Sequence, residues 1–509
     1  MTTDAEPPTP LGRILIAGGT LTAWIAAVRL ASALRGTVRV TVVAPAGPVR
    51  PTSPQVTALS PAFRDALFDR LGTPESTWMR ACSASFNAAT KFAGWRPDPV
   101  YLPDAATPPD CEGFPLTDFW QLRRRTGRTT EPVDHACFVV PPLLDAGKSP
   151  RWLDGRAAFP YGWHADSGLL AEFLRRTAVD TCGVRVRTAE ILGADRDDAG
   201  LITALHTTGG REEADLFLDC TGPAARLMSG LLGEPFVPAA GHAPADRTAT
   251  VTVPHDTARL GIEPYTTVTA LPEGMLWRRP LPGRCDAALA YASTRTTPDE
   301  VAGVLLRAVG LPGTDAARRT VTHTAFTPGR LRRSWAGNCL ALGAAAGSAD
   351  PLAEDHATTL DLLDRLLRDL PSRTAPEAPA ARFDAAAAAH HDRALDLARL
   401  RHATSPAGQT DPAALPARLR SVLRAHAAGL APAPGELPLR TLLTVLTPHT
   451  AAPPAALAHH PHAVRAAEDA FTRIRRHQRT LLETLPPAHS YLAHLTAPAA
   501  APGRAHAPA

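Results

Sequence analysis

The first forty-five residues contain the feature that most restricts the fold: a strand, a glycine turn, a helix and a second strand in close succession. Residues 13–17 form a short apolar run, Gly18 and Gly19 follow, and residues 22–34 have the period of a helix. Residues 38–43 (VRVTVV) predict a second buried strand. A βαβ unit of this length opens a dinucleotide-binding fold, so we expect an α/β protein with a βαβ core at residues 12–44.

The glycine turn departs from the pattern G-x-G-x-x-G that binds a dinucleotide. Gly18 matches its first position, but Thr20 stands at the second and Ala23 at the third, where alanine is tolerated. The Cβ atom of Thr20 would crowd an approaching diphosphate. Ala44 and Pro45 stand where an acidic residue would bind the ribose. The turn alone is compatible with a nucleotide site and with a purely structural βαβ turn.

Further segments predict strands, helices and a change of composition near residue 371. We expect strands at 184–186, 215–219 and 339–342, a β-rich stretch at about 249–293, and helices at 166–181, 355–370, 380–402 and 463–485. This predicts a domain over residues 1–375, a helical C-terminal region over 376–496 and a disordered tail over 497–509. A chain of 509 residues is long enough for two packed lobes or for one large domain with a helical extension.

Composition excludes several classes of function. The net charge of +4 is small and the basic residues are scattered, so we expect no nucleic-acid partner. No run of about 18 apolar residues occurs, and the polar start predicts no signal peptide, so we expect a cytoplasmic protein without a membrane span. The seven cysteines form no C-x-x-C pair, and the clusters at 390–391 and 459–462 have histidines without cysteine or carboxylate partners. We therefore expect no metal site.

Lysine is nearly absent from the chain. Only Lys91 and Lys148 occur among 53 basic residues. Where arginine is so strongly preferred, a remaining lysine indicates a position at which arginine would not serve.

Several segments together resemble the flavin-dependent tryptophan halogenases. Trp24 directly follows the glycine turn, as in that family's opening motif. The other matches follow in the family's order, namely residues 86–96 (FNAATKFAGWR), 119–120 (FW), 161–173 (YGWHADSGLLAEF), 215–222 (DLFLDCTG), 274–284 (GMLWRRPLPGR) and 334–352 (SWAGNCLALGAAAGSADPL). The chain is identified on these residues as a diverged member. The resemblance implies an FAD-dependent monooxygenase/halogenase-like fold with a mixed β-sheet substrate region.

The resemblance also implies the chemistry of the site. Lys91 matches the lysine that holds the halogen electrophile, and a primary amine suits that task because arginine cannot be deprotonated. Glu354 is the candidate acid beside it. The expected cofactor-binding residues are Gly18, Gly19, Thr20, Ala23, Trp24, Gly343, Pro351 and Leu352, and the expected substrate or tunnel residues are Trp95, Trp277 and Pro280.

The family's activity further implies partners. It requires FAD that a separate flavin reductase reduces, a halide, and a small aromatic substrate, either free or bound to a carrier. Such enzymes act in secondary metabolism and antibiotic biosynthesis. A homodimer is one expectation for the assembly.

The departures from the family lie where flavin and halide would bind. The family's G-x-G-E loop aligns with residues 54–57 (PQVT), and Met275 and Arg279 replace apolar residues of its W-x-W-x-I-P motif. Ala353 stands at the position of the family's catalytic glutamate. Either Glu354 takes over that role after a shift of one residue, or Glu354 and Asp355 begin the following helix, where acidic residues suit the helix dipole.

Three functions follow from this mixture. The first is a halogenase that chlorinates or brominates an indole- or pyrrole-type ring. The second is a flavin oxygenase or dehydrogenase of the same fold. The third is a flavin-free member that acts as a partner protein or as a non-redox cyclase. Lys91 favours the first, and Thr20, the 54–57 loop and Ala353 favour the third.

Overall fold

The predicted βαβ unit forms the centre of a six-stranded sheet in the computed structural model. The structure describes residues 9–47, 55–104, 108–239, 243–310, 320–354, 356–406, 412–431, 433, 435–447 and 451–496. Pro54, Asp355 and the expected tail at 497–509 lie outside these residues. The strand order is β10 (Arg185–Thr188), β2 (Arg39–Ala44), β1 (Arg13–Ala17), β14 (Leu216–Asp219), β23 (Cys339–Ala341) and β22 (Trp335–Ala336).

This sheet is parallel except at β22, and helices cover one of its faces. Strand β1 pairs in parallel with β2 and β14. Helix α1 (Leu21–Ala33) crosses from β1 to β2 and packs against α7 (Ser167–Asp180) and α10 (Ala357–Arg368). The strands and helices predicted for this part of the sequence are therefore confirmed, with boundaries that shift by at most two residues.

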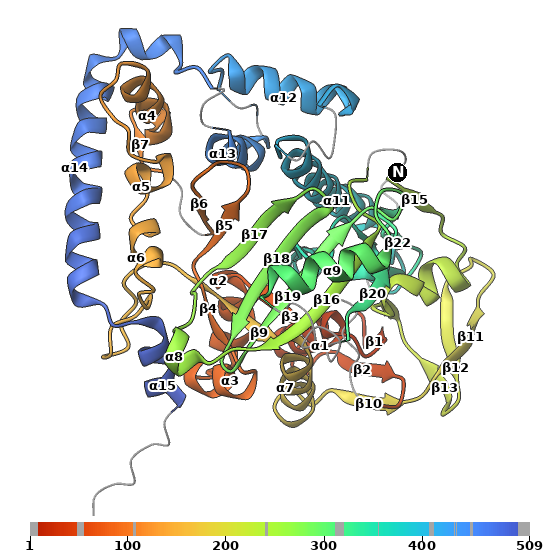
Figure 1. Cartoon of the computed structure of the whole chain (residues 1–509). Helices are drawn as coiled ribbons and strands as arrows, with labels where there is room; N and C mark the ends of the chain where they lie inside the picture. The colour runs from red at the N-terminus through yellow and green to blue at the C-terminus, as the bar shows by residue number, and fades with distance from the viewer. Residues whose placement is uncertain are drawn as a thin grey trace, which may run out of the picture.

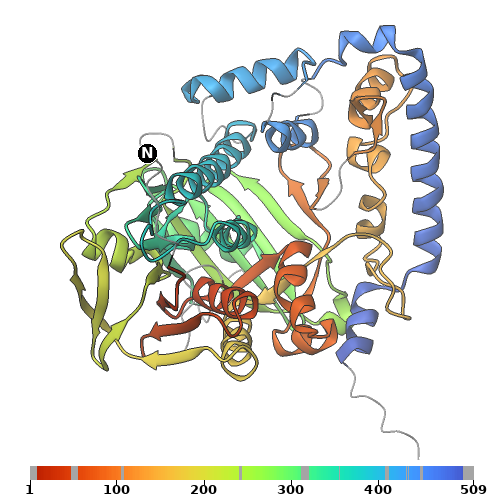
Figure 2. The same cartoon turned by 180° about the vertical axis from the view of Figure 1, so that it is seen from behind.

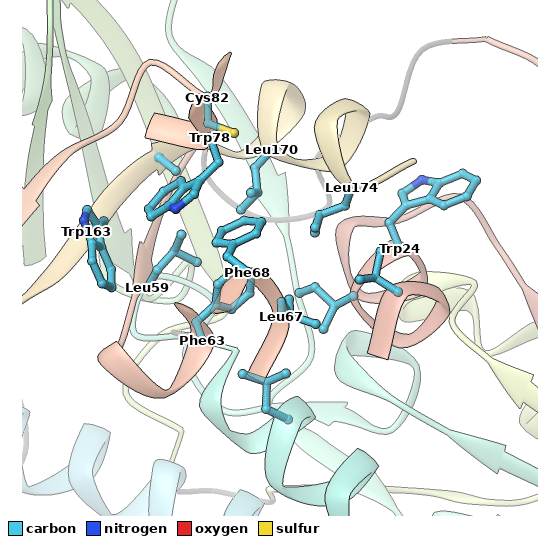
Figure 3. Packing of buried hydrophobic residues seen from close by; sticks show 14 of the residues in the cluster. Trp24, Leu59, Phe63, Leu67, Phe68, Trp78, Cys82, Trp163, Leu170 and Leu174 are labelled. Carbon is cyan, nitrogen blue, oxygen red and sulfur yellow. The ribbon is translucent and has the colours of Figure 1, made fainter. Parts of the chain in front are cut away.

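Aromatic side chains pack beside these helices. Phe68 stacks on Trp78 with ring centroids 4.7 Å apart, and Trp78 meets Trp163 edge to face at 5.3 Å. Figure 3 shows these rings beside Leu170 and Leu174 of α7, with Trp24 of α1 at the far side of the same cluster. Stacked and edge-to-face rings of this kind stabilise a core beyond the area that they bury.

A second, seven-stranded sheet accounts for the predicted β-rich stretch. Its order is β20 (Thr322–Ala325), β16 (Arg247–Pro254), β19 (Arg284–Tyr291), β18 (Gly274–Leu281), β17 (Thr266–Leu271), β5 (Ala89–Ala93) and β6 (Val100–Pro103). All neighbours are antiparallel except β17 and β5. Figure 1 shows this sheet crossing the middle of the molecule, with α9 (Pro298–Ala308) lying on it.

The two faces of this sheet have different surroundings. Phe92, Val268 and Trp277 are paired across β5, β17 and β18, so their side chains lie on one face, in a core shared with the C-terminal helices. Lys91 and Thr267 are the preceding pair and lie on the opposite face. This alternation fixes which candidate residues can meet.

Smaller sheets and helices complete the chain. The small sheets pair β11 (Ile191–Arg196), β12 (Ile202–Thr207) and β13 (Gly210–Glu213); β15 (Phe236–Pro238), β21 (Gly329–Leu331) and β24 (Gly347–Ser348); β3 (Val56–Leu59), β9 (Gly162–Asp166) and β4 (Ser85–Asn87); and β7 (Asp110–Cys111) with β8 (Phe114–Pro115). The remaining helices are α2 (Pro61–Phe63), α3 (Glu75–Ala81), α4 (Leu116–Arg125), α5 (Val133–Cys137), α6 (Pro141–Asp145), α8 (Thr257–Leu260), α11 (Ala380–Ala403), α12 (Ala417–Ala427), α13 (Leu437–Leu446), α14 (Pro461–Thr484) and α15 (Ala488–Thr496). π-Helical turns occur at Arg64–Phe68 and Arg226–Leu231.

The C-terminal region is helical, as the sequence predicts. The long helix α14 runs along α4, α5 and α6, which come from the middle of the chain, and Figures 1 and 2 show this layer at one side of the molecule. Helix α11 packs against α10, and α13 against β6. The proposed boundary at residue 375 therefore stays a prediction, because the two regions share buried surface. Among the described residues, no helix combines the length and apolar character needed to span a membrane.

Candidate functional site

The glycine turn after β1 has the geometry that only glycine allows. Gly18 has φ of 111°, and a Cβ atom there would lie 2.3 Å from the carbonyl oxygen of Cys220. Thr20 is the N-cap of α1: its hydroxyl accepts the N–H of Ala23 at 3.2 Å and donates to the same Cys220 oxygen at 3.0 Å. The Thr20 side chain is thus engaged within the turn, where it caps the helix.

The next residues of the turn serve packing. A Cβ atom on Gly19 would lie 3.1 Å from that of Ala44. Ala23 is fully buried and Trp24 is only 1% exposed, and Figure 3 shows the Trp24 ring at the edge of the hydrophobic cluster. Both side chains belong to the hydrophobic core, and the contact of Ala23 and Trp24 with a cofactor stays a prediction.

A second glycine turn meets the first. Gly343 follows β23 with φ of 60°, and a Cβ atom there would lie 2.6 Å from Oγ1 of Thr22, in the first turn of α1. The N–H of Leu342 donates to the carbonyl of Asp219 at 3.0 Å, which ties β23 to the end of β14. The turns after β1, β14 and β23 therefore lie together at the carboxyl ends of the parallel strands, where open α/β sheets bind ligands.

A pocket of about 520 Å³ opens beside the second turn. It lies between residues 347–354, the start of α10 and one side of α11, and Gly343 is part of its wall. Glu354 faces it and precedes α10, which begins only at Ala357, so Glu354 does not begin the helix. Burial raises the pKa of Glu354, and the charge of His391 acts in the opposite direction. This carboxyl group can therefore exchange a proton closer to neutral pH than an exposed one.

The segment that leads to Glu354 is held by two arginines that sequence reasoning did not select. Arg279 of β18 donates to the carbonyl oxygens of Val56, at 3.1 Å, and Leu352. Arg401 of α11 pairs with Asp350 at 3.1 Å. The sequence marked Arg279 only as a replacement, because nothing local reveals which distant carbonyls it reaches.

The ring of Trp277 contacts both arginines. The Cζ atoms of Arg279 and Arg401 are 5.3 Å and 5.2 Å from the centroid of its ring, within the range of cation–π contacts. Trp95, another expected tunnel residue, is buried and donates its indole N–H to the carbonyl of Arg401 at 3.2 Å. Pro280 accepts the Ser85 hydroxyl at 2.6 Å. The expected tunnel residues thus lie in packed interior around the arginines.

Lys91 lies apart from the two arginines and from the pocket of Glu354. Its Nζ atom is 5.1 Å from the ring of Tyr101 and 5.2 Å from that of Tyr265, and these two rings meet edge to face. Since Lys91 occupies the sheet face opposite Trp277, the sheet separates it from the arginines and from the pocket of Glu354. The structure does not bring Lys91 and Glu354 together into one site.

The surroundings of Lys91 form a polar network. The hydroxyl of Tyr101 donates to Asp145 at 2.7 Å, and His135 bridges Asp145, at 2.9 Å, and Asp134, at 3.2 Å. Burial lowers the pKa of His135, but hydrogen bonds and charges from Asp134 and Asp145 outweigh it and raise that pKa to about 9. The folded chain therefore holds His135 as a cation.

This network predicts a pH dependence of stability. Because the pKa of His135 is higher in the folded state than the usual 6.5, its stabilising effect is complete below pH 6.5 and is lost as pH rises towards 9. We expect His135→Gln to cost about 2 kcal/mol of unfolding free energy at pH 6 and almost nothing at pH 9.5. Urea unfolding of both proteins at the two pH values measures this, and an equal cost at both would contradict it.

A second buried network joins β4, β9 and β17, and the sequence did not indicate it. The side-chain oxygen of Asn87 accepts the N–H of Thr266 at 3.0 Å, and its amide donates to Asp104 at 2.7 Å. His164 bonds the Thr266 hydroxyl at 2.8 Å. Burial lowers the pKa of His164, and the charge of Arg279 lowers it further, so this imidazole is neutral.

The histidine clusters give no metal centre in the parts of the chain that the structure describes. No group of three His, Cys, Asp or Glu side chains there could hold a metal ion. His390 pairs with Asp361 at 2.8 Å, and His391 bonds the carbonyl of Ala387.

Known proteins resemble this arrangement over nearly the whole chain. A family model described as tryptophan halogenase matches residues 13–411. Tryptophan 7-halogenase RebH of Lentzea aerocolonigenes is 32% identical over 95% of this chain and 98% of its own length, and tryptophan 7-halogenase KtzQ of a Kutzneria species (strain 744) is 36% identical over 77% and 76%. The crystal structure of tryptophan 6-halogenase SttH from Streptomyces toxytricini matches with a TM-score of 0.86 at 30% identity, covering 96% of this chain and all of that one.

Proposed function

The chain belongs to the tryptophan halogenase family, and from that premise we propose that it binds FAD and halogenates an aromatic ring of the indole or pyrrole type. One observation carries the proposal. The glycine turns at Gly18 and Gly343 meet at the N-terminus of α1, at the carboxyl ends of the parallel strands, where a dinucleotide diphosphate is bound in such folds. Reduced FAD would supply the reaction with oxygen that converts halide into an electrophile.

The residues present fit FAD at its diphosphate end. Gly18 lets the turn after β1 pack directly against the backbone of Cys220, and the first turn of α1 offers its N–H groups and the positive end of its dipole. Thr20 uses one of these N–H groups for its own cap. Ala44 provides no acceptor for the ribose, so we expect FAD to bind more weakly than in a site with the full pattern.

The residues of the chain would contribute to the chemistry at the pocket of Glu354. A carboxyl group with a raised pKa can accept the proton that an aromatic ring loses on substitution. The pocket volume of about 520 Å³ lies within the range of small-molecule sites. We do not assign the electrophile to Lys91, because a halogenating group held 5.1–5.2 Å from two tyrosine ring centroids would meet two activated rings before any substrate.

Titration with FAD tests the proposal. We expect saturable binding with a Kd in the micromolar range and a rise of the unfolding temperature with FAD concentration, since a ligand that binds only the folded state stabilises it. Absorbance of the bound flavin and thermal unfolding measure the two effects. If neither changes at millimolar FAD, the chain is not a flavin enzyme.

One observation favours a second candidate, a flavin-free member that acts as a partner protein or as a non-redox cyclase. Arg279 bonds the carbonyls of Val56 and Leu352, and the resemblance assigns both of these segments to the flavin side of the site. In this alternative the pocket of Glu354 serves proton transfer without a cofactor. Conversion of an aromatic substrate at an unchanged rate after removal of all flavin would support it.

A further inference from the structure

Arg279 joins two segments from distant parts of the chain. The side chain is only 5% exposed, and its two terminal nitrogens donate to the carbonyl oxygens of Val56 in β3 and of Leu352 in the segment before α10. A single guanidinium group therefore bonds both carbonyl oxygens and holds them close together. Hydrogen bonds from a charged donor are about twice as strong as neutral ones, and breaking them here would leave a buried cation.

Arg401 fixes the same segment from the other side. It is 8% exposed and pairs with Asp350, whose other carboxylate oxygen accepts the N–H of Leu352 at 3.0 Å. The ring of Trp277 contacts both guanidinium groups, so Arg279, Trp277 and Arg401 form one unit, which we call the latch. The latch connects the seven-stranded sheet, β3 and α11 through residues 350–352.

We propose that the latch holds Val56 and Leu352 together in the free protein and thereby closes the ring side of the FAD site until the bonds of Arg279 open. The latter part rests on the proposed function, because the flavin side of the site is assigned to these two segments through the resemblance to the family. The cofactor then binds only the molecules with an open latch, and its apparent affinity is the intrinsic affinity multiplied by the fraction of molecules that are open. Arg279 and Arg401 are positioning residues, since they act through the backbone that carries Glu354.

Hydrogen exchange of the free protein tests the latch without any cofactor. The amides of Leu352 and Ala353 are good reporters, because each is bonded to Asp350 at 3.0 Å within the latched segment. In Arg279→Met we expect these amides to exchange about tenfold faster or more, since local opening no longer breaks two charged hydrogen bonds. Arg279→Lys retains the charge but cannot reach both carbonyls, so the exchange of these amides should accelerate less than in Arg279→Met. This variant also keeps the test valid if the methionine variant does not fold.

Arg278→Met is the matched control. Arg278 precedes Arg279 in β18, lies on the opposite face of the sheet and is half-buried, so the same change there should leave the exchange of Leu352 and Ala353 unaltered. Unchanged exchange of these amides in a folded Arg279 variant would overturn the latch. So would equal acceleration in the Arg278 control.

Titration of the same proteins with FAD separates the latch from the proposed function. About tenfold tighter binding to Arg279→Met than to the unmodified chain and to Arg278→Met supports both. Faster exchange in Arg279→Met with FAD bound by none of the proteins supports the holding of the two segments and overturns the flavin function. Equal FAD affinity in all three, with FAD bound, overturns the claim that the latch closes the site.

Discussion

Replacing Gly18 with alanine is expected to destabilise the protein by about 3–5 kcal/mol and to abolish FAD binding. The added Cβ atom would lie 2.3 Å from the carbonyl oxygen of Cys220 and 2.7 Å from its carbonyl carbon, and both belong to backbone that cannot turn away. The residue also has φ of 111°, which L side chains rarely adopt. The turn would have to shift, and with it the start of α1. Urea unfolding and FAD titration measure the two effects.

Gly36→Ala separates the steric conflict from backbone strain. Gly36 also has positive φ, at 82°, but no atom lies within 4 Å of an added Cβ. We expect it to cost only about 1 kcal/mol and to leave FAD binding unchanged. Similar losses in the two variants would mean that close contact with Cys220 does not restrict the turn.

The sequence predicts most of the fold because the relevant signals are local. Short apolar runs with a glycine within the next three residues mark the parallel strands β1, β14 and β23, and the helical period marks α1, α7, α10, α11 and α14. The boundaries differ by a few residues because caps decide them. Thr20 caps α1 and Asp166 caps α7, so each helix begins one residue later than its cap.

The site could be predicted only in part, because its contacts join residues that are distant in sequence. The motif order located the glycine turns, but strand alternation turned Lys91 towards Tyr101 and Tyr265, away from Glu354. In a chain with so few lysines, Lys91 can have been retained as a cation beside aromatic rings as well as for the reactivity of its amine. The bonds of Arg279 depend on the packing of β3 against the segment before α10, for which a single sequence holds no signal.

Replacing Asp219 with alanine is the second change from which we expect a large effect, a loss of about 3–5 kcal/mol in unfolding free energy. Its side chain is fully buried at the end of β14. One carboxylate oxygen accepts the N–H and the hydroxyl of Thr221, at 3.0 and 2.7 Å, and the other accepts the N–H groups of Leu227 and Met228, at 2.8 and 2.9 Å. Alanine would leave all four donors without this acceptor in the interior.

This loss should reach the cofactor site through Cys220. The carboxylate of Asp219 fixes the turn after β14. The carbonyl of Cys220 in that turn contacts Gly18 and accepts the hydroxyl of Thr20. FAD affinity should therefore fall at least tenfold in folded Asp219→Ala.

Asp197 is the control, because it is exposed and also accepts two backbone N–H groups. Since water can replace this carboxylate, Asp197→Ala should cost less than 1 kcal/mol of unfolding free energy and leave FAD binding unchanged. If Asp219→Ala destabilises no more than Asp197→Ala, the turn after β14 does not depend on this carboxylate, and the Gly18 turn must then be held by α1 and β2 alone.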